Sequence, residues 1–332
     1  MFDCVFSILI PVYNADKYLE RCLTSVVNQT FNRFEIICIN DGSTDSSMDI
    51  LEKYKEKDNR IKIIHIENHG IAYARNLALY YASGEYIYFV DSDDRLELNL
   101  LEVIYNKWIK EAPDIILFDI YRNIGDKEIY TSAYPMNAGG KIDINNSNKG
   151  FASFFLDNYR TVWNKIISKK LLVENNIQFI DLFHADDVLF CLEIGAVAKK
   201  VIYEPFAGYH YYFNATSISQ KYVDNKVIDM VEKLYFEEIK LECKYKNIDF
   251  HKFINTSLIN GIVLIAERYV YNPQNKMAII EKLGRMKCLI NKEPYCMALL
   301  YYDRKYLSKS AKMFIVKNKA NIYVLFLICI IK

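Results

Sequence analysis

Residues 85–94 have the sequence EYIYFVDSDD, a short apolar run that stops at three carboxylates within four residues. The apolar part, Glu85–Val90, is typical of a β-strand. A strand that ends here would place Asp91 and Asp93 at its carboxyl end, where open α/β sheets bind ligands. Asp oxygens suit Mg²⁺ or Mn²⁺, ions that often bridge a protein carboxylate to a substrate diphosphate. The alternative is an acidic turn that caps the next helix.

The chain around this stretch alternates apolar runs with segments of helical periodicity. The run Val5–Ile10 predicts a buried strand stopped by Pro11, and Leu19, Cys22 and Leu23 begin a helical pattern after it. The same reasoning predicts further strands at 34–39, 61–66, 85–90 and 114–120, and helices at 46–57, 71–83 and 97–110. Strands separated by helices of this length indicate βαβ units. The predicted fold class is therefore α/β, a Rossmann-like, mainly parallel sheet flanked by helices.

Polar segments lie beside the ends of these strands. Each alone has an ordinary explanation; residues 41–47, for example, suit a turn followed by a helix N-cap. Four of them at the same edge of one sheet are hard to attribute to turn chemistry. They are Pro11–Asn14 (PVYN), Asn40–Ser47 (NDGSTDSS), Gly70–Asn76 (GIAYARN) and Asp91–Asp94 (DSDD).

Four segments resemble the successive motifs of family 2 glycosyltransferases, in the same order and at similar spacing, within a resemblance that covers roughly residues 5–220. They are Ser7–Asn14 (SILIPVYN), Asp41–Ser47 (DGSTDSS), Gly70–Asn76 (GIAYARN) and Asp91–Asp94 (DSDD). The resemblance implies a GT-A fold that binds a nucleotide-sugar and a divalent cation, Mn²⁺ or Mg²⁺, and a transfer that inverts the anomeric centre. The sequence contains no G-x-G-x-x-G, so a nicotinamide dehydrogenase on a similar sheet is disfavoured.

The resemblance also implies a nucleotide pocket at the first turns. The acidic residue after the second strand contacts the base in the family pattern, and here this residue is Asp41. A carboxylate there suits an N–H of uracil, which favours a UDP-sugar. Pro11, Tyr13 and Asp45 would line the same pocket. Arg75 would add positive charge near the nucleotide or form a salt bridge with one of the aspartates.

In the acidic run, Asp93 matches the metal-coordinating position of the family, and Asp91 the position nearer the ribose and the metal waters. The cation would act as a Lewis acid on the departing diphosphate. Trp163–Lys165 (WNK) also resembles a family segment. Lys165 would face the diphosphate or be solvated, and Trp163 would stack on a sugar ring or lie in the core.

Residues 184–190 (HADDVLF) resemble a later acidic pair of the family, usually Glu-Asp, on the acceptor side. Asp187 matches the residue that deprotonates the incoming hydroxyl, and Asp186 stands where Glu is commoner. An adjacent carboxylate raises the pKa of such a base toward neutrality. The alternative is a plain helix N-cap. His184 is interpreted as a pocket-rim or solvated residue.

Residues 209–219 depart from the family, because no arginine precedes Ser217-Ile218-Ser219. If that arginine normally helps to hold the diphosphate, His210, Lys221 or the metal must replace it here.

Composition sets the outer bounds. A formal net charge of +1 gives no argument for nucleic acid, and eight cysteines without a C-x-x-C pair are interpreted as reduced thiols. We expect no secretory signal, because the first residues lead directly into the first predicted strand. No segment reaches the roughly 18–20 apolar residues of a spanning helix. We therefore expect a cytoplasmic protein.

The last third of the chain has helical periodicity and no catalytic motif. We expect a catalytic domain over residues 1–222 and a helical region over 223–332. Near the end, five lysines precede the uncharged run Ala320–Ile331. This run is too short to span a bilayer, so residues 305–332 either contact the inner face of the cytoplasmic membrane or pack on the domain.

The leading hypothesis is an inverting, metal-assisted glycosyltransferase that uses a UDP-sugar and a saccharide or glycolipid acceptor, in the synthesis of a bacterial surface polysaccharide. The alternatives are a nucleotidyltransferase on a similar sheet and a catalytically silent scaffold of a membrane glycan assembly.

Overall fold

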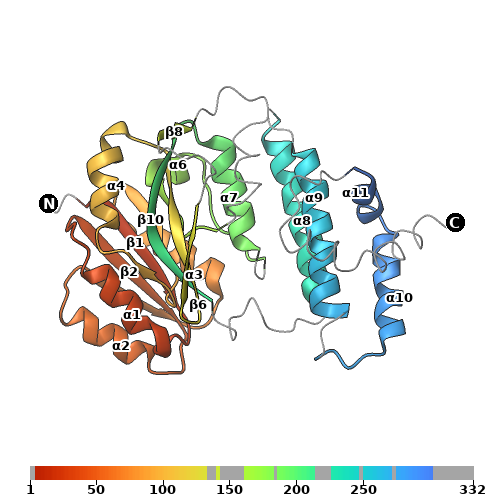
Figure 1. Ribbon diagram of the computed structural model, residues 1–332, viewed down its shortest axis with the longest axis horizontal. Coiled ribbons are helices and arrows are strands. Elements are labelled where there is room, and N and C mark those ends of the chain that lie inside the picture. Colours follow the sequence, from red (N-terminus) through yellow and green to blue (C-terminus); the bar gives the residue numbers. More distant parts are fainter. Residues whose placement is uncertain are drawn as a thin grey trace. The chain divides into compact units, whose positions relative to one another are not determined.

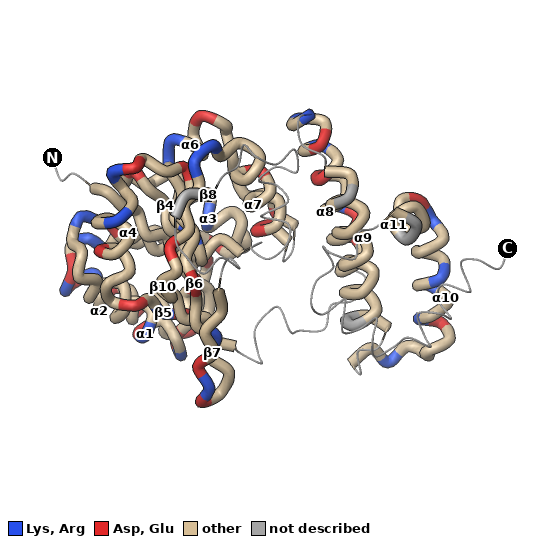
Figure 2. The backbone as a smooth tube through the Cα atoms, turned by 45° about the horizontal axis from the view of Figure 1, so that its top comes forward, with Lys and Arg blue, Asp and Glu red and all other residues tan. Residues whose placement is uncertain are grey.

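The computed structural model describes residues 4–132, 140–142, 161–182, 185–213, 226–246, 250–270 and 274–301. The chain divides into two compact units. The first holds Met1–Ser147, Tyr159–Asp181 and Asp186–Ala215, and the second holds Asn148–Asn158, Leu182–Ala185 and Thr216–Lys332. The domain boundary predicted at residues 222 and 223 lies outside the described residues. Acidic and basic residues are interspersed along the described chain, in keeping with its net charge of +1 (Figure 2).

The first half of the first unit is a parallel βαβ array (Figure 1). Its strands are β1 (Phe6–Val12), β2 (Phe34–Asp41), β3 (Ile61–Ile66) and β4 (Tyr86–Phe89), in the order β3-β2-β1-β4 with parallel pairing throughout. The helices α1 (Asp16–Val27), α2 (Ser47–Lys55) and α3 (Ile71–Tyr81) connect them. The predicted alternation of strands and helices is confirmed, with ends that differ by a few residues.

The second half of the sheet is mixed. The strand β9 (Lys165–Ser168) runs antiparallel to β4 and to β6 (Ile115–Ile124), and β10 (Val201–Tyr212) pairs parallel with β6. The short strands β5 (Arg95–Leu96), β7 (Lys127–Thr131) and β8 (Gly140–Ile142) pair antiparallel with these. The helices among the described residues of this half are α4 (Leu100–Trp108), the 3₁₀ turn η1 (Ile109–Glu111), α6 (Lys169–Glu174) and α7 (Asp186–Val197). The sequence predicted the parallel half and β6, but not these antiparallel pairings.

Pro11 does not stop β1, contrary to the sequence prediction. The carbonyl of Leu9 accepts a hydrogen bond from the Val90 N–H at 3.0 Å, so the backbone N–H and C=O of Leu9 point toward β4. Two residues later, the backbone of Pro11 points to the same side of β1, but β4 has already ended at Phe89. The missing N–H of Pro11 therefore costs no ladder hydrogen bond, and β1 continues to Val12 beside β2.

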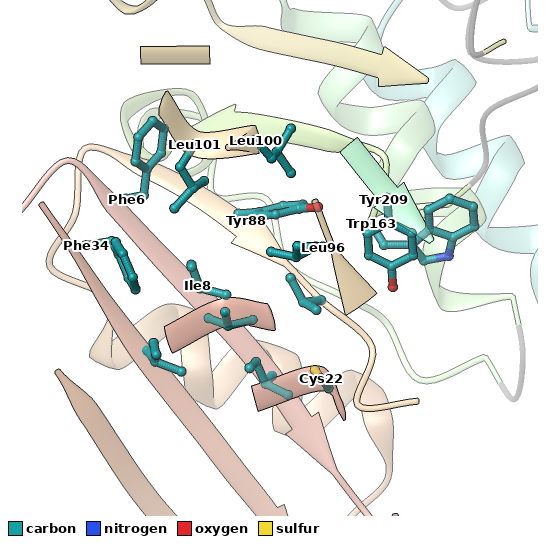
Figure 3. Packing of buried hydrophobic residues seen from close by; sticks show 14 of the residues in the cluster. Phe6, Ile8, Cys22, Phe34, Tyr88, Leu96, Leu100, Leu101, Trp163 and Tyr209 are labelled. Atoms are coloured by element: carbon teal, nitrogen blue, oxygen red, sulfur yellow. The ribbon is translucent and has the colours of Figure 1, made fainter. Parts of the chain in front are cut away.

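The core fills both faces of the parallel strands, as expected for an α/β sheet. Phe6 and Ile8 of β1 lie in one cluster of buried residues with Cys22 of α1 and Leu100 of α4 (Figure 3). Ile10 and Leu19 belong to the same cluster. The helix α3 packs on the strands β1 and β2. Phe89, Phe179 and Phe190 form a separate aromatic cluster with ring centroids 4.0–5.8 Å apart.

The second unit is helical, as predicted. It contains α8 (Lys226–Lys244), α9 (His251–Ile265), a π-helical turn (Ala266–Val270), α10 (Ile279–Ile290) and α11 (Tyr295–Tyr301). Within the described residues, no helix has the length and apolar character needed to cross a bilayer. The predicted membrane contact of residues 305–332 lies outside the described residues.

Candidate active site

Arg75, one turn into α3, links two segments that are distant in the sequence. Its guanidinium is buried and donates through Nη1 to Oδ2 of Asp186 at 2.7 Å and to Asp187, and through Nη2 to Oδ1 of Asp91 at 3.1 Å. It also lies over the ring of Phe179, with 5.3 Å between the guanidinium carbon and the ring centroid. The end of β4 and the start of α7 therefore meet at one side chain. The salt bridge with Asp91 agrees with one of the two alternatives given for Arg75, whereas the contacts with Asp186 and Asp187 were not predicted.

The carboxylates around Arg75 carry more negative charge than one guanidinium neutralises. Burial, together with the charges of Asp186 and Asp91, raises the pKa of Asp187 to about 7 even though Arg75 opposes the shift. Burial and the charge of Asp91 raise the pKa of Asp93 to about 6. The direction for Asp187 is that expected for a proton acceptor working near neutral pH, and the direction for Asp93 is that expected for a buried carboxylate beside a second one.

The acidic loop Asp91–Asp94 follows β4 directly and is held by its backbone. Its turn is closed by a hydrogen bond from the Asp94 N–H to the Asp91 carbonyl at 3.2 Å. The thiol of Cys22 donates to the same carbonyl at 3.6 Å, and the guanidinium of Arg21 donates to the carbonyl of Asp93. Sequence analysis missed both contacts, because nothing in the local sequence distinguishes Arg21 and Cys22 from the other residues of α1.

The divalent cation implied by the family resemblance suits this loop. Within the described ranges, no three His, Cys, Asp or Glu side chains form a ready-made metal cage. Mg²⁺ and similar ions are commonly held by only one or two carboxylates together with substrate phosphates and waters. Asp91 and Asp93 are partly exposed and supply that donor set.

The predicted nucleotide residues lie on loops that are tied to one another. Asp41 ends β2 and accepts hydrogen bonds from the backbone N–H groups of His69 at 2.7 Å and Gly70 at 2.9 Å. These bonds hold the entry to α3, where Gly70 has a φ of 87° that favours glycine. A carboxylate has further lone pairs, so the contact of Asp41 with a base stays a prediction.

Asp45, Tyr13 and Pro11 lie nearby in the fold. Asp45 accepts backbone hydrogen bonds from Asp16 and Ser47, each at 3.0 Å, at the first turns of α1 and α2. Tyr13 is 46% exposed, whereas Pro11 is buried. The structure thus gives Asp45 a helix-capping role, and the predicted contacts of these residues with the nucleotide stay predictions.

Lys165 is fully buried at the start of β9. Its ammonium donates to Oδ1 of Asn164 at 2.7 Å and to the carbonyl of Thr161, and burial lowers its pKa. The charge of Asp187 opposes that shift. The predicted diphosphate contact of Lys165 stays a prediction, but the alternative of a solvated lysine is wrong.

Trp163 and His210 have partners within the fold. The indole of Trp163 is 9% exposed and stacks on Tyr209, so its place is the core rather than an open sugar platform. The ring nitrogens of His210 contact Glu97 and Glu128. His184, residues 214–219 and Lys221 lie outside the described residues.

Comparisons with known proteins agree with this architecture. The family described as "Glycosyl transferase family 2" matches residues 7–174, about half of the chain. A Bacillus subtilis protein named as glycosyltransferase EpsH is 31% identical over 278 residues, covering 76% of this chain and 75% of that protein. The cholesterol galactosyltransferase of Borreliella burgdorferi is 31% identical over 304 residues, covering 85% of this chain and 83% of that protein.

Among solved structures, S. aureus TarS 1–349 in complex with UDP-GlcNAc has a similar fold. Its TM-score is 0.65 at 23% identity, covering 95% of this chain and 92% of that chain. The predicted GT-A fold is therefore confirmed. Together with the family match and the two relatives, this shows that the chain is a glycosyltransferase that belongs to family 2.

Proposed function

We propose that this glycosyltransferase moves a sugar from a UDP-sugar to a saccharide acceptor and inverts the anomeric centre. The observation that carries the proposal is the contact of Arg75 with Asp91 on one side and with Asp187 on the other. One side chain thereby sets the spacing between the carboxylate assigned to the donor and the carboxylate assigned to the acceptor. The structure of TarS with UDP-GlcNAc, a protein of similar fold, supports UDP as the nucleotide.

Asp187 is the general base of this proposal. Its carboxylate takes the proton of the acceptor hydroxyl as the hydroxyl oxygen attacks the anomeric carbon and the bond to UDP breaks. Asp187 lies at the first turn of α7 and is 21% exposed, so an acceptor can reach it. Asp186 is more buried, and its charge helps to raise the pKa of Asp187 toward neutrality.

Asp93 and Asp91 are the proposed holders of Mn²⁺ or Mg²⁺. When bound, the cation would neutralise charge on the departing diphosphate. Asp41 is the proposed contact of the uracil base, with Pro11 and Tyr13 beside it. Asp45 supports this pocket because it accepts hydrogen bonds at the starts of α1 and α2. Lys165 at the start of β9 is the proposed positively charged contact of the diphosphate.

The proposed acceptor is a saccharide or glycolipid of a bacterial surface polysaccharide. The name of the B. burgdorferi relative states that it glycosylates cholesterol, a membrane lipid, which supports an acceptor at a membrane. The five lysines and the uncharged run of residues 305–332 support peripheral contact with the inner face of the cytoplasmic membrane. We assign catalysis to residues 1–222 and leave 223–332 as the helical region.

Binding and hydrolysis of a panel of UDP-sugars, with and without Mn²⁺, test the proposal. We expect Mn²⁺-dependent UDP binding and slow hydrolysis of one donor, both lost in Asp93→Ala. Asp126→Ala removes an exposed carboxylate from the β6–β7 turn and should match the wild type. Binding that survives Asp93→Ala would refute the cation assignment. Pyrophosphate release from a nucleoside triphosphate would favour a nucleotidyltransferase, and no nucleotide binding at all would favour a scaffold.

A further inference from the structure

Asp94 ends the acidic loop and differs from its neighbours in its surroundings. It is 1% exposed, whereas Asp91 and Asp93 are partly exposed. Both of its oxygens face β10: Oδ2 accepts a hydrogen bond from the Tyr209 hydroxyl at 2.6 Å, and Oδ1 accepts one from the Tyr212 N–H at 2.8 Å. The geometry of Asp94 is that of an anchor to the sheet rather than of a ligand open to solvent.

The hydroxyl of Tyr209 contacts both ends of the loop. It donates to the carboxylate of Asp94 and accepts a hydrogen bond from the backbone N–H of Asp91 at 3.3 Å. A single buried oxygen atom thus fixes the distance between the first and the last residue of the loop. Its loss would leave an N–H and a carboxylate oxygen unsatisfied in a buried place, which is costlier than an ordinary lost hydrogen bond.

The ring of Tyr209 has little freedom to move. Its plane is 12° from that of Trp163, with 4.8 Å between the ring centroids (Figure 3). Trp163 is stacked on its neighbour Tyr211 as well, at 5.6 Å and 12°. The backbone of Tyr209 is paired with Ile120 of β6 and with Leu96 of β5. The hydroxyl is therefore held by the sheet and by an aromatic stack.

The carbonyls of the loop are held by α1, through the contacts of Cys22 with Asp91 and of Arg21 with Asp93. Arg21 in turn lies over the ring of Tyr212, with 3.5 Å between its guanidinium carbon and the ring centroid. The loop backbone is thus fixed before any ligand arrives, which lowers the cost of ordering it during binding.

We propose that Tyr209 is a positioning residue that sets the acidic loop so that Asp91 and Asp93 meet the cation and the diphosphate, with Asp94 as its anchor and not as a ligand. This inference rests on the proposed function, because it assigns the loop to UDP and a divalent cation. It separates the three carboxylates into two that bind and one that holds the loop.

The test compares Tyr209→Phe with Tyr211→Phe. Both remove a hydroxyl from rings stacked on Trp163, but only Tyr209 holds the loop. Free Mn²⁺, followed by electron paramagnetic resonance in the presence of UDP, reports bound cation without turnover. We expect a roughly tenfold higher half-saturating Mn²⁺ concentration in Tyr209→Phe, as for a lost buried hydrogen bond, and a change of less than about twofold in Tyr211→Phe. Circular dichroism and thermal melting check that both variants are folded.

Asp94→Asn and Asp93→Asn test the anchor separately. An asparagine at position 94 keeps Oδ1 as the acceptor for the Tyr212 N–H, and its Nδ2 can donate to the Tyr209 hydroxyl oxygen, so we expect Mn²⁺ binding within roughly threefold of the wild type. Asp93→Asn should lose it. Equal Mn²⁺ binding in Tyr209→Phe and Tyr211→Phe, or an Asp94→Asn variant as defective as Asp93→Asn, would overturn the inference alone. A wild type that binds no UDP with Mn²⁺ would overturn the proposed function and this inference together.

Discussion

Arg75 and Asp187 are in direct contact although 112 positions separate them in the chain. The contact joins the first turn of α7 to α3, and through Asp91 to the end of β4. Since the guanidinium is buried, it cannot exchange these carboxylates for water without opening the structure. The relative position of Asp91 and Asp187 therefore depends on the buried guanidinium of Arg75.

Replacing Arg75 by Met should destabilise the protein by about 3 kcal/mol, because it leaves three carboxylates close together without their counter-charge. Urea denaturation at pH 8 measures this. The control is Lys53→Met, which breaks the exposed pair of Lys53 on α2 with Glu20 on α1 and should cost less than about 0.5 kcal/mol. Equal midpoints for the two variants would show that the Arg75 cluster contributes nothing to stability.

Replacing Asp187 by Asn should slow sugar transfer roughly a thousandfold, the scale of a lost general base, while UDP-sugar binding persists. The substitution keeps the shape of the side chain and its contact with Arg75. Calorimetric titration with the donor and a transfer assay on the same preparation separate the two effects. Transfer at more than a tenth of the wild-type rate would remove Asp187 as the base.

The transfer rate should rise with pH and level off above about 7. Burial and the charge of Asp186 raise the pKa of Asp187 to about 7, so below that pH the base is increasingly protonated and the rate falls. In Asp186→Asn one of the charges that raise the pKa of Asp187 is absent, so the rise of the transfer rate with pH should occur at lower pH. Asp126→Asn serves as the control and should leave the pH–rate profile unchanged. An unchanged profile in Asp186→Asn would mean that another group controls the pH dependence.

The same shift has a consequence for stability. The pKa of Asp187 in the folded protein lies above its ordinary value of 3.8, so folding favours the protonated form. Its contribution to stability is complete below pH 3.8 and is lost as the pH rises through about 7. Asp187→Asn should therefore be more stable than the wild type at pH 8 but not at pH 4, in urea denaturation at both values.

The sequence predicted the parts of the fold whose signal is local. Val5–Ile10, 34–39 and 61–66 are apolar runs between helices, and each is a strand of the parallel half. The antiparallel strands were missed because their identity depends on distant partners: β9 is placed by its pairing with β4 and β6, not by a pattern of its own. The prediction that Pro11 ends the first strand was wrong, because a proline is tolerated in β1 only where β4 has already ended, and the sequence does not show that.

The candidate site shows the same division. Asp91, Asp93 and Asp187 could be named as candidates because their motifs stand in a recognisable order, and their roles stay predictions. Sequence analysis named a salt bridge of Arg75 with the acidic run as one alternative. It missed the contacts of Arg75 with Asp186 and Asp187, since these require knowing that α7 begins beside α3. The anchoring of Asp94 by Tyr209 has no sequence signal, because 115 positions separate the two residues and a tyrosine in a strand is ordinary.

A last prediction concerns Glu35 on β2, which ties three segments together away from the site. Its carboxylate accepts hydrogen bonds from the hydroxyl of Ser7 at 2.6 Å, from the backbone and hydroxyl of Ser83 at 2.6 and 2.7 Å, and from Lys62 at 2.6 Å. Burial alone would raise the pKa of Glu35, but these donors outweigh it and hold the pKa at about 2.

Because the pKa of Glu35 in the folded protein lies below its ordinary value of 4.5, its stabilising contribution is complete above pH 4.5 and is lost as the pH falls through about 2. Glu35→Gln should therefore lower the free energy of unfolding by about 2 kcal/mol at pH 7, with a smaller difference at pH 3. Glu85→Gln, an exposed neighbour of Ser83, is the control and should change it by less than about 0.5 kcal/mol. A difference between Glu35→Gln and the wild type that stays constant from pH 7 to pH 3 would show that the charge of Glu35 is not what stabilises this junction.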